Sequence, residues 1–132
     1  MSIVNDVYVL VIEVGKNVNV NVGALGNLNF EKGIYIYVGS AKKGLRKRIE
    51  RHLRKNKTKF WHIDYLLSDE SVNVLKVFAV QGPFEECEVA NIISEKGVPM
   101  RGFGSSDCRC ISHLFKVEDY QFLRGFMHEL QL

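Results

Sequence analysis

Tyrosine and arginine side chains follow one another closely between residues 34 and 54. The run IYIYVGS places Tyr35 and Tyr37 among apolar residues and ends in a Gly-Ser turn, and the basic segment LRKRIERHLR follows. A phenol at the end of a strand can hold or present an attacking water, and an arginine binds phosphate through two parallel hydrogen bonds. Such groups could act on a phosphate ester, but from the sequence alone alternating tyrosines more often pack one face of a sheet.

Residues 42–59 carry most of the positive charge of the chain. They contain ten of its 18 basic residues and a single acidic residue, Glu50, so the remainder is net negative. Like charges at helical spacing repel, and concentrating them on one element is typical of a surface that binds a polyanion. The alternative is a solvated helix followed by a lysine-rich loop. The candidate nucleic-acid-binding residues are Lys42, Lys43, Arg46, Lys47, Arg51, Arg54, Lys55, Lys57, Lys59 and, beside Trp61, His62.

The segment FEECEVAN offers carboxylates that could hold a metal ion. Mg²⁺ and Mn²⁺ favour carboxylate oxygen, and Mg²⁺ often accepts one protein ligand plus water molecules. Glu86 shares a helical face with Ala90 and Ile93, so it is expected to point inward and is the first candidate. Glu88 is the close alternative, and Glu85 suits the first turn of a helix. An acidic first turn with no metal role remains possible on this pattern.

A second set of potential metal ligands lies in SSDCRCISHLF, where Asp107, Cys108, Cys110 and His113 occur close together. The spacing C-x-C-x₂-H is unusual for zinc, and a structural zinc site normally has four ligands. Buried structural cysteines are more common. The pattern therefore favours a tight loop whose backbone N–H and hydroxyl groups order the site or contact phosphate, and zinc is the less favoured alternative. The loop residues singled out are Ser105, Ser106, Asp107 and His113.

Length and composition fit a single domain in a reducing compartment. The chain has 132 residues, of which 46% are apolar, so residues 1–132 can form one domain with a sizeable core. Three cysteines, an odd number, do not suggest a disulfide scaffold. No apolar run reaches the length of a membrane span, and the N-terminus lacks the pattern of a signal peptide. We therefore expect a cytoplasmic protein without a membrane partner.

Apolar periodicity predicts the elements that position these side chains. Strands are expected at residues 7–14, 18–22, 27–30 and 34–39. A helix is expected at residues 45–55, with Ile49 and His52 on its buried side and Arg48 beside His52. The remaining predictions are a short helix within residues 59–68, a strand at 71–80, a helix at 83–97, a loop at 98–110, a strand at 112–117 and an amphipathic helix at 118–130.

The order of these elements indicates an α+β or mixed α/β fold. Four early strands joined as hairpins precede the first helix, and helices then alternate with single strands. Helices of this kind cover a small central antiparallel or mixed sheet.

The spacing of Tyr8, Tyr37 and Arg48, with a glutamate further on, resembles the GIY-YIG nuclease superfamily. There, each of two early strands carries a tyrosine, the next helix an arginine and a later helix a glutamate. The segment YVG at Tyr37 matches the second signature, and DVY, which ends at Tyr8, is the better match to the first. The visible GIY ending at Tyr35 is a decoy, because one residue between it and Tyr37 leaves no room for two strands. Asp6 stands where the motif has glycine.

Longer motifs resemble a little-characterised branch of this superfamily that is found mainly in archaea and thermophiles. They are GSA, RIERHL, WHIDYLL, ECEVA and GFGSSDCRCISHLF, and the similarity extends from about residue 7 to residue 115. The resemblance implies a GIY-YIG-like fold with one hairpin inserted between the two signatures.

The resemblance also implies roles for individual residues. Tyr8 and Tyr37 would orient or activate water, and Arg48 would bind the scissile phosphate. His52 stands where many members carry another tyrosine, and it could relay a proton, bind phosphate or serve as a hydrogen-bonded structural histidine. A glutamate of the ECEVA segment would hold the divalent cation.

These observations predict a nucleic-acid-binding protein whose expected partner is DNA. The expected activity is metal-dependent hydrolysis of phosphodiester bonds by an endonuclease, with affinity that falls steeply with salt. The alternatives are a catalytically inactive module of the same fold that binds DNA or RNA, and a zinc-stabilised interaction domain. A protein partner that supplies targeting is left open.

Overall fold

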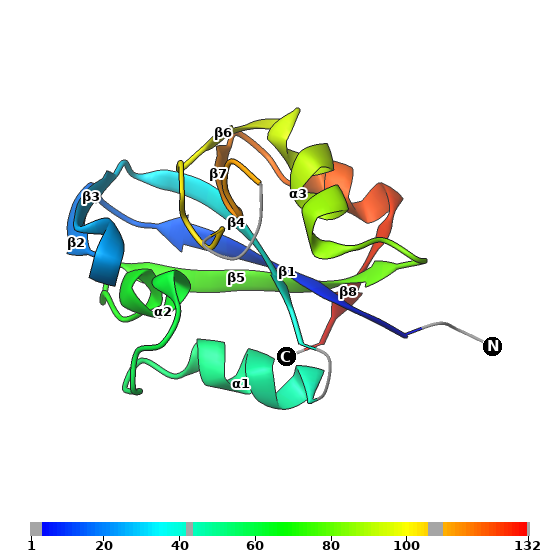
Figure 1. The fold of residues 1–132 in the computed structure, drawn as a ribbon, viewed down its shortest axis with the longest axis horizontal. Coiled ribbons are helices and arrows are strands. Elements are labelled where there is room, and N and C mark those ends of the chain that lie inside the picture. Colours follow the sequence, from blue (N-terminus) through cyan, green and yellow to red (C-terminus); the bar gives the residue numbers. More distant parts are fainter. Residues whose placement is uncertain (1–3, 42–43, 106–109, 132) are drawn as a thin grey trace.

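A six-stranded antiparallel sheet forms the centre of the protein. The structure is a computed structural model that describes residues 4–41, 44–105 and 110–131 (Figure 1). Neighbouring strands follow the order β6-β7-β4-β1-β5-β8. Their bounds are β1 (Val4–Val14), β4 (Gly33–Ser40), β5 (Val72–Gln81), β6 (Gly97–Pro99), β7 (Leu114–Val117) and β8 (Met127–Leu130).

Helices cover both faces of this sheet, as in a mixed α+β fold. One face carries α1, α2 and a separate two-stranded sheet, and the other carries α3 and a 3₁₀ turn, with α1 and α3 on opposite sides in Figure 1. The bounds are β2 (Val18–Asn21), β3 (Asn27–Phe30), α1 (Leu45–Leu53), α2 (His62–Leu67), α3 (Glu86–Ser94), the 3₁₀ turn η1 (Gly23–Leu25) and the 3₁₀ turn η2 (Gln121–Gly125). None of the described helices is long and apolar enough to cross a membrane.

The central strand β1 is buried on both faces, which explains its almost continuous apolar sequence. Side chains alternate along a strand, so Tyr8 and Leu10 pack beneath α1 and α2 whereas Val9 and Val11 pack beneath α3. The register of β1 therefore decides which helices each side chain meets. Tyr8 reaches the α1 face for this reason.

Most of the predicted elements are confirmed within a few residues. The four early strands, the helix α1 and the strands β5 and β7 occur where the periodicity placed them, and the predicted short helix is α2. The β2–β3 hairpin is inserted between β1 and β4 as its own two-stranded sheet. The helix predicted at 83–97 is shorter, because Glu85 is the N-cap and the helix ends at Ser94.

The amphipathic helix predicted at residues 118–130 is wrong. This region forms η2 and then β8, which pairs antiparallel with β5 through Val80 opposite Met127 and Val77 opposite Leu130. The outer edge of β5 offers backbone donors and acceptors, and pairing with it outweighs the local helical pattern. Leu123 and Met127 are nevertheless buried. The segment therefore does present apolar side chains to the core, but from a 3₁₀ turn and a strand rather than from one helix.

The loop predicted at residues 98–110 contains a short strand at its start. Residues of β6 pair with β7, with Gly97 opposite Val117 and Pro99 opposite Phe115. A Cβ atom added at Gly97 would lie 2.7 Å from the carbonyl oxygen of Lys116, so a larger residue would clash with the backbone of β7. The close approach of the two strands depends on this glycine.

Candidate functional site

A pocket of about 390 Å³ opens where β1, β4, α1 and α3 come together. It brings two phenols, a guanidinium, a carboxylate and an imidazole to one place, from positions far apart in the sequence. The lining residues are Tyr8, Tyr37, Gly39, Ser40, Arg48, Trp61, Glu86, Gly104 and His113. A larger hollow of about 740 Å³ beside β6, β7 and η2 contains lysine and acidic side chains but no comparable group.

Tyr8 lies beneath β4 and is 1% exposed. It stands opposite Gly39 in the β1–β4 register, and a Cβ atom at Gly39 would lie 2.6 Å from the phenol oxygen. Only glycine leaves room for the ring there. Burial raises the pKa of Tyr8 well above its ordinary value, although the nearby Arg48 guanidinium opposes this. Tyr8 therefore remains a protonated phenol at neutral pH.

Tyr37 on β4 joins Tyr8 on the same face of the sheet. Its ring lies edge-on to His52, with centroids 6.2 Å apart, and to Phe103, at 6.4 Å. Burial, together with the neighbouring Tyr8 and Glu86, raises the pKa of the Tyr37 phenol. In contrast, the hydroxyl of Tyr35 donates to the carbonyl of Glu31 and takes no part in lining the pocket.

His52 of α1 is buried beside Tyr8, with its Nε2 atom 2.6 Å from the Tyr8 hydroxyl. Its other ring nitrogen, Nδ1, is buried and has no hydrogen-bond partner within the described part of the chain. Burial lowers the pKa of His52 to about 4, and the positive charge of Lys57 adds to this. The imidazole is therefore neutral near pH 7.

Arg48 is held at the rim of the pocket by two neighbours. Its Nη1 atom donates to the carbonyl of Ser40 at 3.0 Å, and its guanidinium carbon lies 4.3 Å from the ring centroid of Trp61. A guanidinium has five N–H donors, so the bond to Ser40 uses one of them. The arrangement fixes the plane of the cation at the entrance to the pocket.

Glu86 and Glu88, the two candidate metal ligands, have different environments. Glu86 lines the pocket, and its Oε2 atom lies 2.9 Å from Nδ1 of His113. Burial alone would raise the pKa of Glu86, but hydrogen bonds from His113 and Ser40 bring it below the usual value, so the carboxylate is ionised. Glu88 is exposed, and its Oε1 atom accepts from the N–H of Glu85 as part of a capping box.

Three cations of the basic segment make hydrogen bonds within the protein and stabilise the fold. Arg51 binds both carboxylate oxygens of Asp64, at 2.8 and 2.9 Å. The ammonium group of Lys55 donates to the carbonyls of Leu67, Asp69 and Val72. Lys57 donates to the carbonyls of Arg51 and His52 at the end of α1, and burial lowers its pKa to about 8. Arg51 and Lys55 therefore connect α1 and the segment after it with α2 and β5, whereas Lys57 binds the last carbonyls of α1.

The rest of the basic segment faces solvent. Arg46 and Lys47 are exposed on α1, Arg54 is exposed just beyond it, and Lys59 lies 6.0 Å over the ring of Tyr65. The candidate residues Lys42 and Lys43 lie outside the described residues. Among the described residues, fewer cations are therefore available to bind a polyanion than the sequence alone indicates, because Arg51, Lys55 and Lys57 already bind groups of the protein.

Two exposed aromatic side chains lie beside this surface. Phe60 is 73% exposed and Trp61 is 38% exposed, and the guanidinium of Arg51 lies 4.6 Å from the ring centroid of Trp61. The carboxylate of Asp64 accepts from the backbone N–H groups of both residues and so fixes this segment at the start of α2. From the sequence, Trp61 was named only as the neighbour of His62, and its position in the pocket wall was missed.

The loop candidates are only partly described. Ser105 and His113 are buried, and Gly104 lines the pocket with φ near +70°. The N–H of Gly104 donates to Nδ1 of His62 at 2.8 Å. His62 therefore stabilises this turn, and the N–H of Gly104 is not available to bind a phosphate. The candidates Ser106 and Asp107 lie outside the described residues.

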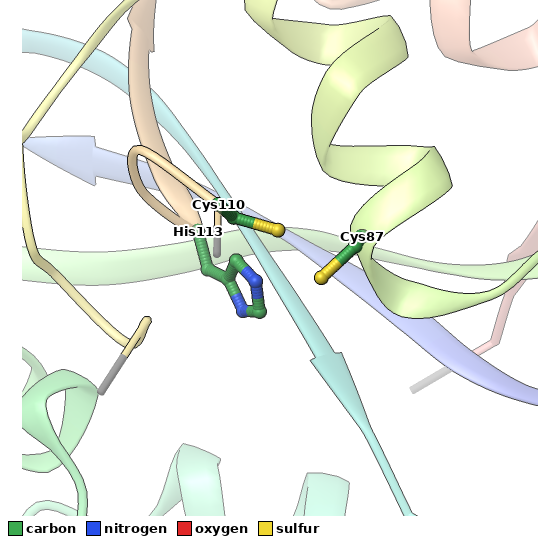
Figure 2. Close-up of side chains that lie close together, drawn as sticks. All are labelled: Cys87, Cys110 and His113. Atoms are coloured by element: carbon green, nitrogen blue, oxygen red, sulfur yellow. The ribbon is translucent and has the colours of Figure 1, made fainter. Parts of the chain in front are cut away.

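A group of potential soft-metal ligands lies next to the pocket. The thiols of Cys87 and Cys110 and a ring nitrogen of His113 all lie within 4.8 Å of one another (Figure 2). Cys87 follows Glu86 on α3 and was missed by sequence reasoning, which grouped Cys110 and His113 with Cys108. Cys108 lies outside the described residues.

Comparison with known proteins identifies the family of the chain. A family model described as Domain of unknown function DUF123 matches residues 7–131, so the chain belongs to this family. No curated protein and no solved structure matches the chain. The geometry of the site is therefore the main basis for assigning an activity.

Proposed function

We propose that the chain is a GIY-YIG-type endonuclease that hydrolyses phosphodiester bonds in DNA with the help of Mg²⁺ or Mn²⁺. The observation that carries the proposal is the convergence of Tyr8, Tyr37, Arg48 and Glu86 on one pocket. They come from β1, β4, α1 and α3, and they are the residue types that the GIY-YIG resemblance calls for. These four elements are separate in the sequence, and packing of a hydrophobic core does not by itself require these residue types to meet in one pocket.

The carboxylate of Glu86 fits a hard divalent cation. It is ionised and lines the pocket beside two phenols. A carboxylate has about four acceptor positions, so hydrogen bonds from His113 and Ser40 leave room for a cation that also keeps several water molecules. When bound, Mg²⁺ or Mn²⁺ supplies Lewis-acid stabilisation of charge on the phosphate and lowers the pKa of a bound water.

The side chains of the pocket can position a phosphate and orient the attacking water. The guanidinium of Arg48 is placed to bind two phosphate oxygens and to stabilise negative charge as a water attacks phosphorus. When the Tyr8 hydroxyl donates to Nε2 of His52, its oxygen can accept a hydrogen bond from that water. With a pKa of about 4, His52 stays neutral and holds the Tyr8 hydroxyl in this orientation, so that Tyr8 can orient the attacking water.

The surface around the pocket suits a nucleic-acid strand. Exposed Lys47 on α1 and Arg54 just beyond it supply positive charge, while Phe60 and Trp61 offer faces on which bases can stack. We propose that this surface binds the DNA backbone and one unstacked base next to the scissile phosphate. Binding of this kind weakens as salt concentration rises.

A cleavage assay with matched variants tests the proposal. Linear, branched and flapped DNAs are incubated with Mg²⁺, Mn²⁺ or a chelator, and products are resolved on denaturing gels. Arg48→Ala and Glu86→Ala are expected to lower the cleavage rate on the order of 100-fold or more. Glu50→Ala, two residues from Arg48 on α1, and Glu88→Ala, two residues from Glu86 on α3, change exposed side chains and are the controls that should retain cleavage. Unchanged cleavage in both pocket variants would refute the assigned site.

A non-catalytic DNA-binding module is the second candidate function. It is favoured by contacts within the pocket that already engage the proposed catalytic groups. Arg48 is bound to Ser40 and stacked on Trp61, and Tyr8 is bound to His52. The same DNAs distinguish the two candidates. Salt-sensitive binding without cleavage in either metal would support the module and exclude the nuclease.

A further inference from the structure

Three side chains of the kind that bind zinc meet behind the wall of the pocket. Cys87 comes from the first turn of α3, while Cys110 and His113 come from the segment that leads into β7. Figure 2 shows the two thiols and the imidazole directed toward a common space. Their ligand atoms, two sulfurs and one ring nitrogen, all lie within 4.8 Å of one another.

We propose that Cys87, Cys110 and His113 bind a Zn²⁺ ion. Thiolate sulfur and imidazole nitrogen are ligands that Zn²⁺ favours, whereas Mg²⁺ and Mn²⁺ favour oxygen. Sulfur ligands about 2.3 Å from a tetrahedral ion lie about 3.8 Å apart. Because the three ligand atoms lie within 4.8 Å of one another, the two sulfur atoms need to approach by at most about 1 Å, which side-chain rotation can supply.

The contact between His113 and the carboxylate of Glu86 supports this assignment independently. Histidines that bind metals usually donate their other ring N–H to a carboxylate or carbonyl, which fixes the tautomer and the orientation of the ring. Here Nδ1 of His113 and Oε2 of Glu86 are 2.9 Å apart. When Nδ1–H donates to this carboxylate, a neutral imidazole presents its lone pair on Nε2, which is the atom we assign to zinc.

The proposed zinc site lies beside the pocket and is distinct from the Mg²⁺ or Mn²⁺ position at Glu86. Zinc would connect α3 with the segment before β7 through Cys87 on one side and Cys110 and His113 on the other. Through His113 it would also orient the carboxylate of Glu86. Glu86 is thus a positioning residue for zinc, and the zinc proposal does not depend on DNA cleavage.

Metal analysis of the full chain is the first test. Protein purified under reducing conditions from zinc-supplemented cells is expected to contain about one zinc per chain by mass spectrometry of the elements. Cobalt titration of the zinc-stripped protein should give thiolate-to-cobalt charge-transfer absorption and the intense visible bands of a tetrahedral site. Protein without zinc that also shows no thiolate-to-cobalt band would overturn the proposal, as would a disulfide between Cys87 and Cys110 in the reduced preparation.

Single variants assign the ligands. Cys87→Ser, Cys110→Ser and His113→Asn should each lose stoichiometric zinc, and the two serine variants should weaken the charge-transfer band. His128→Asn, at an exposed position on β8, is the matched control and should keep both the stoichiometric zinc and the charge-transfer band. Full zinc content in all three ligand variants would refute the assignment. Because a ligand variant can fail to fold, the cobalt titration of the unaltered chain stands as a separate test.

Glu86→Gln tests the positioning role through zinc affinity measured by competition with a chromophoric chelator. Loss of a carboxylate partner of a ligating histidine typically weakens metal affinity by about 10-fold to 100-fold. Glu88→Gln, which alters an exposed carboxylate on the same helix, should leave the zinc affinity unchanged. Equal affinities in the Glu86 variant and the unaltered chain would show that Glu86 does not orient His113.

Discussion

The two walls of the pocket are built in different ways. The tyrosine wall consists of Tyr8, Tyr37, Arg48, His52 and Trp61, and its tyrosines and histidine are each at most 8% exposed. Strand register, close contact with Gly39 and core packing fix these groups. This wall is therefore part of the hydrophobic core as well as part of the site.

The α3 wall consists of Glu86, Cys87, Cys110 and His113, and it depends on a few polar contacts. One of these contacts joins the buried imidazole of His113 to a Glu86 side chain that is 28% exposed. The difference between the walls indicates that the tyrosine wall is preformed, whereas the α3 wall is the one that bound metal would tighten. The predictions below test this contrast, beginning with the largest expected effect on stability.

Removing the carboxylate that supports the tyrosine wall should have the largest effect. Asp64 is fully buried and accepts hydrogen bonds from Arg51, Phe60 and Trp61. Asp64→Ala leaves the Arg51 guanidinium without its buried partner, and breaking such a pair costs about 3–5 kcal/mol. Urea denaturation measures the loss. Glu50→Ala on the exposed side of α1 is the control, and a similar small change in both variants would contradict the role of Asp64.

His52 should make the tyrosine wall sensitive to acid. Because its pKa in the folded protein is about 4, below the ordinary 6.5, the unfolded chain takes up the proton first as pH falls. The resulting stability is fully present above about pH 6.5 and is lost between there and about pH 4, by roughly 3 kcal/mol. The groups that face His52 are Tyr8, Lys57, Asp64, Arg48 and Arg51.

Urea denaturation across this pH range measures the effect. Carboxylates also titrate there, so the comparison is with His52→Gln, in which the added slope between pH 6.5 and 4 should disappear. Parallel pH profiles for the two proteins would mean that His52 is protonated equally in the folded and unfolded states.

A methyl group between β1 and β4 should disturb the tyrosine wall to a smaller extent. Gly39→Ala places a Cβ atom 2.6 Å from the Tyr8 phenol, and overpacking of this kind costs about 1–3 kcal/mol. Gly125→Ala is the control, because nothing lies within 4 Å of its added Cβ atom. Thermal unfolding of the two variants provides the measurement. Equal melting temperatures would indicate that the phenol moves aside at little cost.

The smallest effect is expected on the α3 wall in the absence of bound metal. Glu86→Gln weakens the hydrogen bond with His113, and because the carboxylate is partly exposed the cost is about 1 kcal/mol. Urea denaturation of zinc-stripped protein tests this, with Glu95→Gln at an exposed position beyond α3 as the control. A loss larger than that of Asp64→Ala would reverse the proposed contrast between the walls.

The sequence predicted the tyrosine wall better than the α3 wall. Alternation along β1 and β4 identifies the faces of Tyr8 and Tyr37, and helical spacing places Arg48 beside His52, so local periodicity is sufficient there. Glu86 was selected over Glu88 by the same reasoning. Cys87 was missed, because its proximity to Cys110 and His113 depends on how α3 packs over the sheet rather than on any local spacing.

Long-range contacts also explain the other differences. Lys55 and Lys57 donate to backbone carbonyls, and such partners carry no side-chain signature in the sequence. The C-terminal segment has a helical pattern, but the edge of β5 provides a pairing partner that periodicity cannot reveal. Charge composition therefore identified a basic region correctly without separating its structural cations from its exposed ones.

The position of Trp61 gives the pocket an internal optical reporter. It is the single tryptophan of the chain, it lines the pocket and it lies against the guanidinium groups of Arg48 and Arg51. Intrinsic fluorescence excited at the tryptophan band therefore originates at the entrance to the site. A base or phosphate that displaces either arginine would change the emission without any attached label, so occupancy of the pocket could be followed in the unmodified protein.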